Sequence, residues 1–240
     1  MTARSRRTQG AGDEPDHGAS TPARSNGTPL VPVTPRGEET RRRLLDAAEE
    51  VFGEMGYYEA SVAEITRRAG VAQGTFYIYF HSKRETFVEL VEDIGERLRT
   101  ATTAAIQETS DRIEAERNGF EAFFRFVYAH RRIYRIVEEA GRVAPEAAHE
   151  YYRRISVGYE RGLAAAMNAG QINNGNVEGL AYALMGIGHF LALRWIIWPS
   201  EGSAAEKGGV GTTDGDTLRV PGEVFETVMA FIARGLGSER

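Results

Sequence analysis

The side chains most suited to recognition chemistry lie in residues 73–79, which read Gln-Gly-Thr-Phe-Tyr-Ile-Tyr. A glutamine can form two hydrogen bonds with the edge of an adenine base, and threonine and isoleucine can contact a thymine methyl group. Tyrosine hydroxyls suit phosphate oxygens, which fix the position of a protein on a duplex but carry no sequence information. A glycine such as Gly74 lets the backbone approach a partner closely. The run therefore predicts contact with double-stranded DNA.

Two helices are predicted before this run. Apolar residues over 44–55 recur at the spacing of one helical face, so a first helix begins near Arg36 and stops at Gly56. Ser61 and Glu64 have the spacing of a capping box, in which a serine accepts a hydrogen bond from the third residue of its helix. This spacing predicts a short second helix that begins directly after the serine.

A tight turn joins the second predicted helix to the third. Gly70 ends the second helix, because glycine adopts a positive φ at no steric cost, and Val71 packs the turn against the core. The third helix then covers residues 73–79. Phe76 and Phe80 lie four residues apart and face inward, so the remaining side chains of this helix face outward or sideways. Three short helices with such a turn are typical of a helix-turn-helix, whose second helix of the pair enters the major groove.

Phosphate-binding side chains are predicted on both sides of the third helix. The helix N-terminus capped by Ser61 favours an anion. Arg41 and Arg42 begin the first helix, while His81 and Lys83 flank the start of a fourth. The residues predicted to contact DNA are Arg41, Arg42, Ser61, Ala72, Gln73, Gly74, Thr75, Tyr77, Ile78, Tyr79, His81 and Lys83.

The run EASVAEITRRAGVAQGTFYIYFHSKRETF resembles the N-terminal domain of the TetR family of repressors. The matching features are the Ala-Gly-Val turn at 69–71, the Gly-Thr-Phe-Tyr core at 74–77, the aromatic pair at 79–80 and Ser-Lys at 82–83. Together with the first helix, the resemblance covers about residues 38–90. It implies an all-α homodimer with a small-molecule pocket in each C-terminal domain, where ligand binding separates the two recognition helices and releases DNA.

Two residues depart from the family pattern. Ala72 stands where the family often has serine or threonine, which removes a helix cap worth about 1 kcal/mol. Ile78 stands where a polar residue is common, which leaves the base contact at that position open and favours T-rich sequences. The alternative interpretation, a small helical bundle without a role in DNA binding, has to explain why turn, caps and aromatic anchors coincide.

The rest of the chain is predicted to be helical, which makes the fold class all-α. Ser82 and Glu85 open the long fourth helix with a second capping-box spacing. Further helices are predicted near 117–137, 145–169, 176–198 and 222–236, with Pro145 at the start of the second of these and a mobile loop over 200–221. The predicted domains are a disordered tail (1–36), a helix-turn-helix domain (37–84) and a larger helical domain for effector binding and dimerisation (85–240).

The tail is rich in Gly, Pro, Ser and Thr and cannot bury enough apolar surface to offset ordering entropy. Four of its arginines are interpreted either as a weak electrostatic contact with DNA or as part of a solvated tail: Arg4, Arg6, Arg7 and Arg24.

An apolar cavity with a few polar groups is expected inside the C-terminal helices. Aromatic side chains are dense there, and each candidate is weighed against ordinary core packing. The candidate effector-pocket residues are Phe123, Tyr128, Tyr152, Tyr159, Met185 and His189.

The last two predicted helices are expected to form the interface of a homodimer. Small residues between 181 and 192 permit close helix packing, and a two-fold dimer presents two recognition helices to two half-sites. The stretch 180–198 is also apolar enough to suggest a membrane span, but His189 and Arg194 argue against it.

Composition restricts the rival classes. The 240-residue chain carries a net charge of −5, yet residues 36–84 hold eight basic and eight acidic side chains, so the acidity lies further along. Cysteine is absent, and the histidines are scattered without metal spacing, so no metal or cofactor is expected. No phosphate-binding loop or nucleophile motif supports an enzyme, and no secretory signal is seen, which favours the cytoplasm.

The second rival is a protein that binds apolar ligands and keeps a vestigial DNA-binding domain. For the regulator, repression is expected rather than activation. The effector class is a lipid-like or aromatic metabolite, with an acyl-CoA or a drug-like compound among the candidates.

Overall fold

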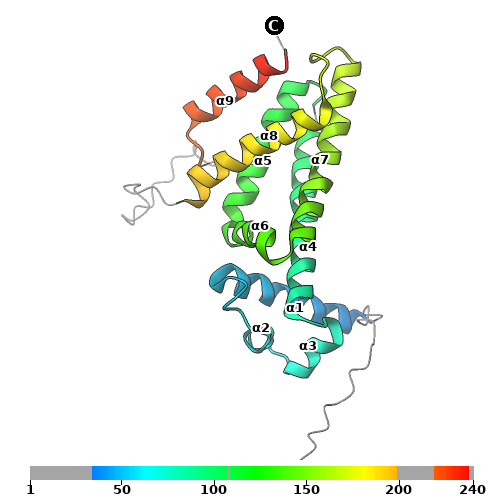
Figure 1. Cartoon of the computed structure of the whole chain (residues 1–240), viewed down its shortest axis with the longest axis vertical. Coiled ribbons are helices and arrows are strands. Elements are labelled where there is room, and N and C mark those ends of the chain that lie inside the picture. Colours follow the sequence, from blue (N-terminus) through cyan, green and yellow to red (C-terminus); the bar gives the residue numbers. More distant parts are fainter. Residues whose placement is uncertain (1–33, 108, 199–218, 238–240) are drawn as a thin grey trace, which may run out of the picture.

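The computed structural model describes residues 34–107, 109–198 and 219–237. Within these residues the regular structure is helical and no strand occurs, which confirms the predicted all-α class. Figure 1 shows α1, α2 and α3 gathered at one end of the molecule, with α4 running from there towards the other helices. The helices are α1 (Pro35–Met55), α2 (Val62–Ala69), α3 (Gln73–Tyr79), α4 (Lys83–Ile106), α5 (Arg112–Ala129), α6 (Arg131–Val143), α7 (Pro145–Asn168), α8 (Val177–Ala192), the π-helical turn η1 (Leu193–Ile197) and α9 (Gly222–Gly235).

Side-chain caps and glycines set the ends of the N-terminal helices as the sequence predicts. The Thr34 hydroxyl accepts a hydrogen bond from the Gly37 amide at 3.2 Å, and α1 stops at Gly56, whose φ is 79°. At α2, the Ser61 hydroxyl accepts from the Glu64 amide at 3.1 Å. Each cap satisfies an amide that the helix itself leaves without a partner, so the boundaries follow from local sequence.

One predicted helix is wrong, because residues near 117–137 form two helices. The first of them, α5, starts earlier than predicted, at Arg112, behind the side-chain cap of Asp111. His130, with φ −123° and ψ 43°, then separates α5 from α6. Neither glycine nor proline marks this position, and α6 leaves the direction of α5 to pack against α1. The break therefore follows from tertiary packing.

The other C-terminal predictions agree with the structure. The helix predicted over 145–169 is α7, with Pro145 in its first turn, and the stretch 176–198 is covered by α8 and η1. The last helix, predicted over 222–236, is α9. The predicted tail lies almost wholly outside the described residues, as does most of the predicted loop at 200–221.

Two buried apolar clusters hold the helices together. The first joins the inner faces of α1 to α4 with α6 and the start of α7, and it includes Phe76 of α3 and Phe87 of α4. The second joins α5, α8, η1 and α9 with the second half of α7. Since the first cluster contains residues from both sides of position 84, the predicted boundary between 37–84 and 85–240 crosses a shared core.

Within the described residues, one helical run, Val177–Ile197, is long and apolar enough to cross a membrane by length and composition. Core helices of soluble proteins pass the same test. Only 39% of its most apolar window is buried, so much of the α8–η1 surface is apolar and uncovered within a single chain.

Candidate nucleic-acid interface and interior cavity

The turn between α2 and α3 is fixed from two sides. Gly70 adopts a left-handed conformation with φ 65°, and the Val71 amide donates to the Thr66 carbonyl at 3.0 Å. From α1, the Arg43 guanidinium donates to the carbonyls of Ala69 and Gly70. A cation at the C-terminal end of a helix is favoured by the helix dipole. The turn is therefore clamped in the geometry of a helix-turn-helix.

Helix α3 is anchored by aromatic side chains and presents its other face to solvent. Phe76 and Phe80 are fully buried, which confirms both as inward anchors. Tyr77 and Ile78 are 53% and 47% exposed. Ala72 precedes the helix without any side-chain cap, as its residue type predicts. The α3 residues predicted to face DNA divide into exposed Gln73, Gly74, Tyr77 and Ile78, and half-buried Thr75 and Tyr79.

Three of the predicted phosphate contacts lie on the surface near α3. Ser61 and His81 are exposed, and the exposed Arg42 guanidinium pairs with Glu39 at 2.7 Å. Ion pairs this exposed contribute little to stability, so Arg42 can exchange its partner at small cost. These three positions remain predictions for contact with DNA.

Lys83 has a different role from the predicted phosphate contact. Its ammonium donates to the carbonyls of Tyr57 at 2.8 Å and Ala60 at 2.7 Å, and it lies 4.5 Å from the Tyr57 ring centroid. Burial lowers the pKa of Lys83, partly offset by the nearby Glu59 carboxylate. We reassign Lys83 to the connection between α1 and α2, because a phosphate would have to displace these internal bonds.

Arg41 is also engaged inside the protein. Its guanidinium forms an ion pair with Glu89 of α4 and lies 5.3 Å from the Phe80 ring centroid. Sequence reasoning placed Arg41 on DNA and gave no separate role to Arg43, because spacing alone does not show which arginine of a cluster turns inward.

Helix α2 carries its cations as an ion-pair network. The Glu64 carboxylate accepts hydrogen bonds from Arg67 at 2.7 Å and from Arg68 at 2.8 Å, and these two bonds lower the pKa of Glu64 to about 2. Arg68 also reaches Glu54 of α1 at 2.7 Å. Glu64 therefore binds arginines instead of returning to the amide of Ser61, as a full capping box would have it.

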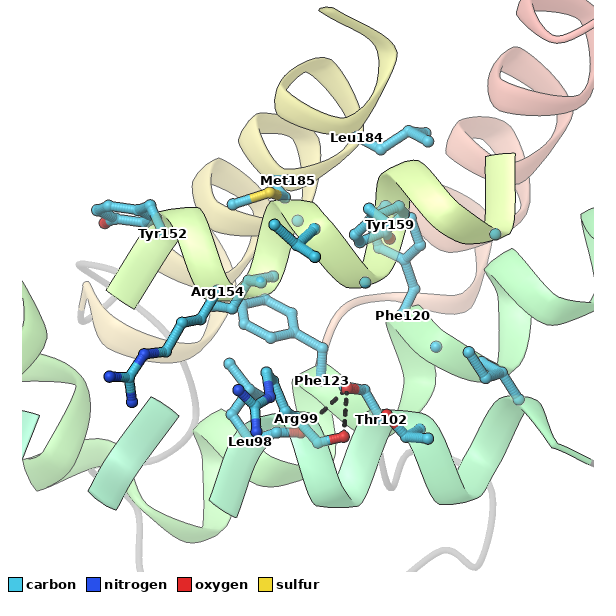
Figure 2. A pocket seen from close by; sticks show the side chains of 18 of the residues that line it. Leu98, Arg99, Thr102, Phe120, Phe123, Tyr152, Arg154, Tyr159, Leu184 and Met185 are labelled. Carbon is cyan, nitrogen blue, oxygen red and sulfur yellow. Dashed lines mark hydrogen bonds between the residues drawn. The ribbon is translucent and has the colours of Figure 1, made fainter. Parts of the chain in front are cut away.

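A cavity of about 580 Å³ lies among α4, α5, α6, α7 and α8. Figure 2 shows Phe120 and Phe123 of α5 and Met185 of α8 directed at this space, with Arg99 and Arg154 at its side. The wall is mostly apolar with a few polar groups, which is the usual composition of a small-molecule site. Five residues predicted for a pocket line it: Phe123, Tyr152, Tyr159, Met185 and His189.

Tyr128, the sixth predicted pocket residue, does not line the cavity. Its hydroxyl accepts a hydrogen bond from Arg219 at 2.8 Å, and its ring lies 4.7 Å from the Arg131 guanidinium. The prediction was wrong because the break at His130 turns α6 away, which leaves the end of α5 facing the segment before α9.

One end of the cavity is closed by a hydrogen bond between Tyr134 of α6 and His189 of α8. Burial lowers the pKa of His189, partly offset by Glu138, whose carboxylate lies 3.9 Å from Nε2. Burial raises the pKa of Tyr134, so its hydroxyl keeps the proton. With its proton on Nε2, towards Glu138, the neutral imidazole accepts from the tyrosine at Nδ1. With the proton on Nδ1, it donates to the tyrosine oxygen.

Helix α6 lies between the cavity and the N-terminal helices. Tyr134 and Val137 line the cavity, while Ile136 is fully buried in the cluster shared with α1. Next to them, the Glu139 carboxylate accepts from the Tyr57 amide at 2.8 Å. The cavity wall and the residues that follow α1 are therefore in contact through α6.

The sequence profile of the bacterial regulatory proteins of the tetR family matches residues 44–90, which span most of α1, α2, α3 and the start of α4. These residues therefore resemble the N-terminal helix-turn-helix domain of the TetR family. The described residues contain no group of three His, Cys, Asp or Glu side chains placed to hold a metal ion.

Individual relatives agree with this family. The chain is 42% identical over 73 residues to the HTH-type transcriptional regulator YdgC of Bacillus subtilis, covering 30% of this chain and 37% of the relative. It is 35% identical over 102 residues to the HTH-type transcriptional activator FasR of Mycolicibacterium smegmatis, covering 42% and 47%. The chain thus spans less than half the length of these relatives.

Among solved structures, the fatty acid degradation regulator FadR from Bacillus halodurans has a similar fold, with a TM-score of 0.66 at 19% identity over 83% of this chain and 97% of that one. The two sequence relatives are named as transcriptional regulators, as expected for a helix-turn-helix of this kind.

Proposed function

We propose that this protein is a homodimeric transcriptional regulator that grips operator DNA with α3 and leaves it when a small apolar molecule fills the cavity. The observation that carries the proposal is the position of α6, which forms part of the cavity wall and packs against α1. Since α1 clamps the turn before α3 through Arg43, the cavity and the recognition helix belong to one packed unit. The resemblance of residues 44–90 to the TetR family supports the DNA-binding part.

Sequence recognition falls to the exposed face of α3. Gln73 can form two hydrogen bonds with adenine, and Ile78 can pack on a thymine methyl group. The open space beside Gly74, where an added Cβ has nothing within 4 Å, leaves room for close approach of a duplex. With Arg41 and Lys83 held internally, the proposed phosphate contacts come from Arg42, Ser61, Tyr77 and His81.

A second copy of the chain is the proposed cover for the apolar surface of α8 and α9. Phe190 and Phe231 are 66% and 64% exposed, and Tyr182 is 45% exposed. Exposed aromatic side chains on neighbouring elements are typical of interaction surfaces. A two-fold dimer places its two α3 helices over half-sites about 34 Å apart. If a second copy covers the apolar surface of α8, this surface requires no membrane. We therefore place the protein in the cytoplasm.

The proposed mode is repression, because occupation of promoter DNA needs no further surface. FasR is named a transcriptional activator, so the position of the bound site relative to the promoter decides this point. The proposed effector is lipid-like or aromatic, with fatty-acyl compounds first. The fold shared with FadR, which is named for fatty acid degradation, and the largely apolar cavity support this class.

The deciding experiment selects genomic fragments bound by the purified protein and measures their affinity by gel shift. We expect preference for one set of fragments over random DNA, and a binding constant that falls with salt by about −0.9 in logarithmic slope per phosphate contacted. Equal binding of all fragments would overturn the proposal.

Matched tyrosine variants locate the contact surface. Tyr77→Phe removes an exposed hydroxyl on α3 and is expected to weaken binding of every fragment, while Tyr58→Phe removes one that is 71% exposed outside α3 and leaves binding unchanged. Equal effects of the two variants would contradict the placement of α3 on DNA.

The dimer is tested by light scattering without detergent. The wild type is expected to be dimeric, and the double variant Phe190→Ser/Phe231→Ser to be monomeric and to lose operator binding. A wild type that is monomeric, or that requires detergent or lipid vesicles to stay dispersed, would overturn the second-copy assignment.

A further inference from the structure

A buried ion pair forms part of the cavity wall where α5 begins. Arg112 and Glu116, one helical turn apart, have side chains only 10% and 1% exposed, and they pair with each other. The Tyr159 hydroxyl of α7 donates to Glu116 Oε2 at 3.1 Å. All three residues line the cavity, and Figure 2 shows Tyr159 close to the apolar side chains of the wall. Replacing such a pair by apolar residues often leaves stability unchanged or improves it, so stability alone does not explain its presence.

One donor of this pair is unused. Among the described residues, the Arg112 Nε atom is buried and has no hydrogen-bond partner, and no other buried side-chain nitrogen or oxygen there shares this state. A buried donor without a partner destabilises the folded protein, because it has lost its hydrogen bond to water. The cost disappears when an oxygen from a bound molecule accepts its hydrogen bond.

Glycines of α7 leave room beside the guanidinium. A Cβ at Gly162 would lie 2.6 Å from Arg112 Nη1, which no side chain tolerates without a shift. One turn earlier, Gly158 has nothing within 4 Å of an added Cβ, and it also lines the cavity. Helix α7 therefore carries glycines instead of larger side chains where the Arg112 guanidinium and a ligand group need space.

The charge of the site selects the kind of oxygen. Glu116 neutralises Arg112, so this pair itself has no formal charge left to attract an anion. Four further arginines line the cavity, and Glu96 or Glu150 pairs with three of them: Arg99, Arg153 and Arg154, with Arg161 the fourth. Burial already raises the pKa of Glu116, opposed by Arg112 and by the hydrogen bond from Tyr159. A ligand carboxylate placed beside Glu116 would add like-charge repulsion in a site of low dielectric. An uncharged acceptor avoids this repulsion.

We propose that Arg112 is the polar anchor of the cavity and donates a hydrogen bond to the uncharged carbonyl oxygen of an otherwise apolar ligand, such as an ester or a thioester. The inference rests on the proposed function and specifies the effector class. Glu116 is a positioning residue that holds the guanidinium, and the apolar wall around Phe120 and Phe123 receives the hydrocarbon part.

The test compares four probes of similar length: methyl dodecanoate, S-methyl thiododecanoate, the dodecanoate ion and 1-tridecene. Their dissociation constants are measured by competition with a fluorescent apolar probe at pH 8. We expect at least one carbonyl probe to bind about ten times more tightly than both the hydrocarbon and the ion, and the preferred one separates ester from thioester recognition. Equal binding of carbonyl probes and hydrocarbon, or tightest binding of the ion, would overturn the proposal.

The variant for this test removes both charges together, because a single substitution would leave a buried charge without its partner. In Arg112→Met/Glu116→Met the tenfold carbonyl preference is expected to fall below about twofold, with hydrocarbon affinity kept. The control Arg117→Met/Glu226→Met removes an exposed ion pair whose guanidinium comes from the same helix and whose residues do not line the cavity. A preference that survives in the first variant, or that disappears equally in both, refutes the anchor.

Operator binding is measured on the same preparations without ligand. If the wild type shows no carbonyl preference but binds operator DNA normally, the anchor alone is overturned. A carbonyl preference without any operator binding supports the anchor and overturns the proposed function.

Discussion

The N-terminal helices and the cavity use their charged side chains in opposite ways. Around α3, Arg43 and Lys83 are held by backbone carbonyls and stabilise turns, so the surface proposed to meet DNA consists largely of neutral side chains. In the cavity, Arg112 and Glu116 satisfy each other only in part, and one donor stays open. A cation whose donors are engaged by backbone carbonyls stabilises the fold. A buried cation that keeps one N–H without a partner can donate it to a bound molecule.

The largest expected effect comes from the aromatic anchor of α3. Phe76→Ala removes a fully buried ring and should lower the free energy of unfolding by about 3–5 kcal/mol, with loss of operator binding. Urea denaturation followed by circular dichroism measures this. The exposed neighbour provides the control, since Tyr77→Ala should change the stability by less than about 1 kcal/mol. Similar destabilisation by both variants would contradict the inward and outward faces of α3.

Lys83 tests the claim that cations near α3 stabilise turns. Lys83→Met leaves the carbonyls of Tyr57 and Ala60 without their donor and should lower the free energy of unfolding by about 1–3 kcal/mol. Arg42→Met, at an exposed ion pair, should cost less than about 1 kcal/mol. If Lys83→Met weakens operator binding while the urea midpoint stays unchanged, Lys83 contacts phosphate as first predicted. The claim that the cations near α3 stabilise turns would then be wrong for this residue.

Gln73 is the residue on the neutral surface of α3 that we expect to recognise a specific base. Gln73→Ala should reduce the discrimination between bases at one base pair by about 1–3 kcal/mol. The relative affinities for operators that are changed at other base pairs should stay the same. Gel shifts on a panel of single-base operator variants measure this. A uniform loss across the whole panel would show that the glutamine only positions the protein.

The smallest expected effect is the pH response of the cavity. Because the pKa of His189 is lowered in the folded protein, the unfolded chain binds more protons below about pH 6.5, and stability falls as the pH drops through that value. The slope from this residue is at most about 1.4 kcal/mol per pH unit. His189→Gln should flatten the fall between pH 7 and 5.5, measured by urea denaturation.

The control for the pH response is His149→Gln, at an exposed position of α7. Equal curves for the His189 variant and the wild type would remove the cavity histidine as the source. His130, whose pKa is also lowered by burial, accounts for the slope that remains in the His189 variant.

The helix-turn-helix was predictable because its determinants are local. The caps at Ser61 and Ser82, the left-handed Gly70 and the anchors Phe76 and Phe80 act within a few residues of one another. Short-range hydrogen bonds and helical spacing are therefore enough to place α2 and α3 and to show which face of α3 is free. The same reasoning identified five cavity residues as aromatic or polar side chains on apolar helices, but it did not separate them from Tyr128.

Tertiary structure decided the rest. The sequence carries no sign of the break at His130, which exists because α6 must leave α5 to pack on α1. Lys83 turns inward because the carbonyls of Tyr57 and Ala60, between α1 and α2, converge on its ammonium, and sequence spacing does not reveal this arrangement. The open donor of Arg112 likewise exists only where α5 and α7 meet. The sequence by itself determined the motif and its faces, while the partners of each charge depended on contacts between residues far apart in the chain.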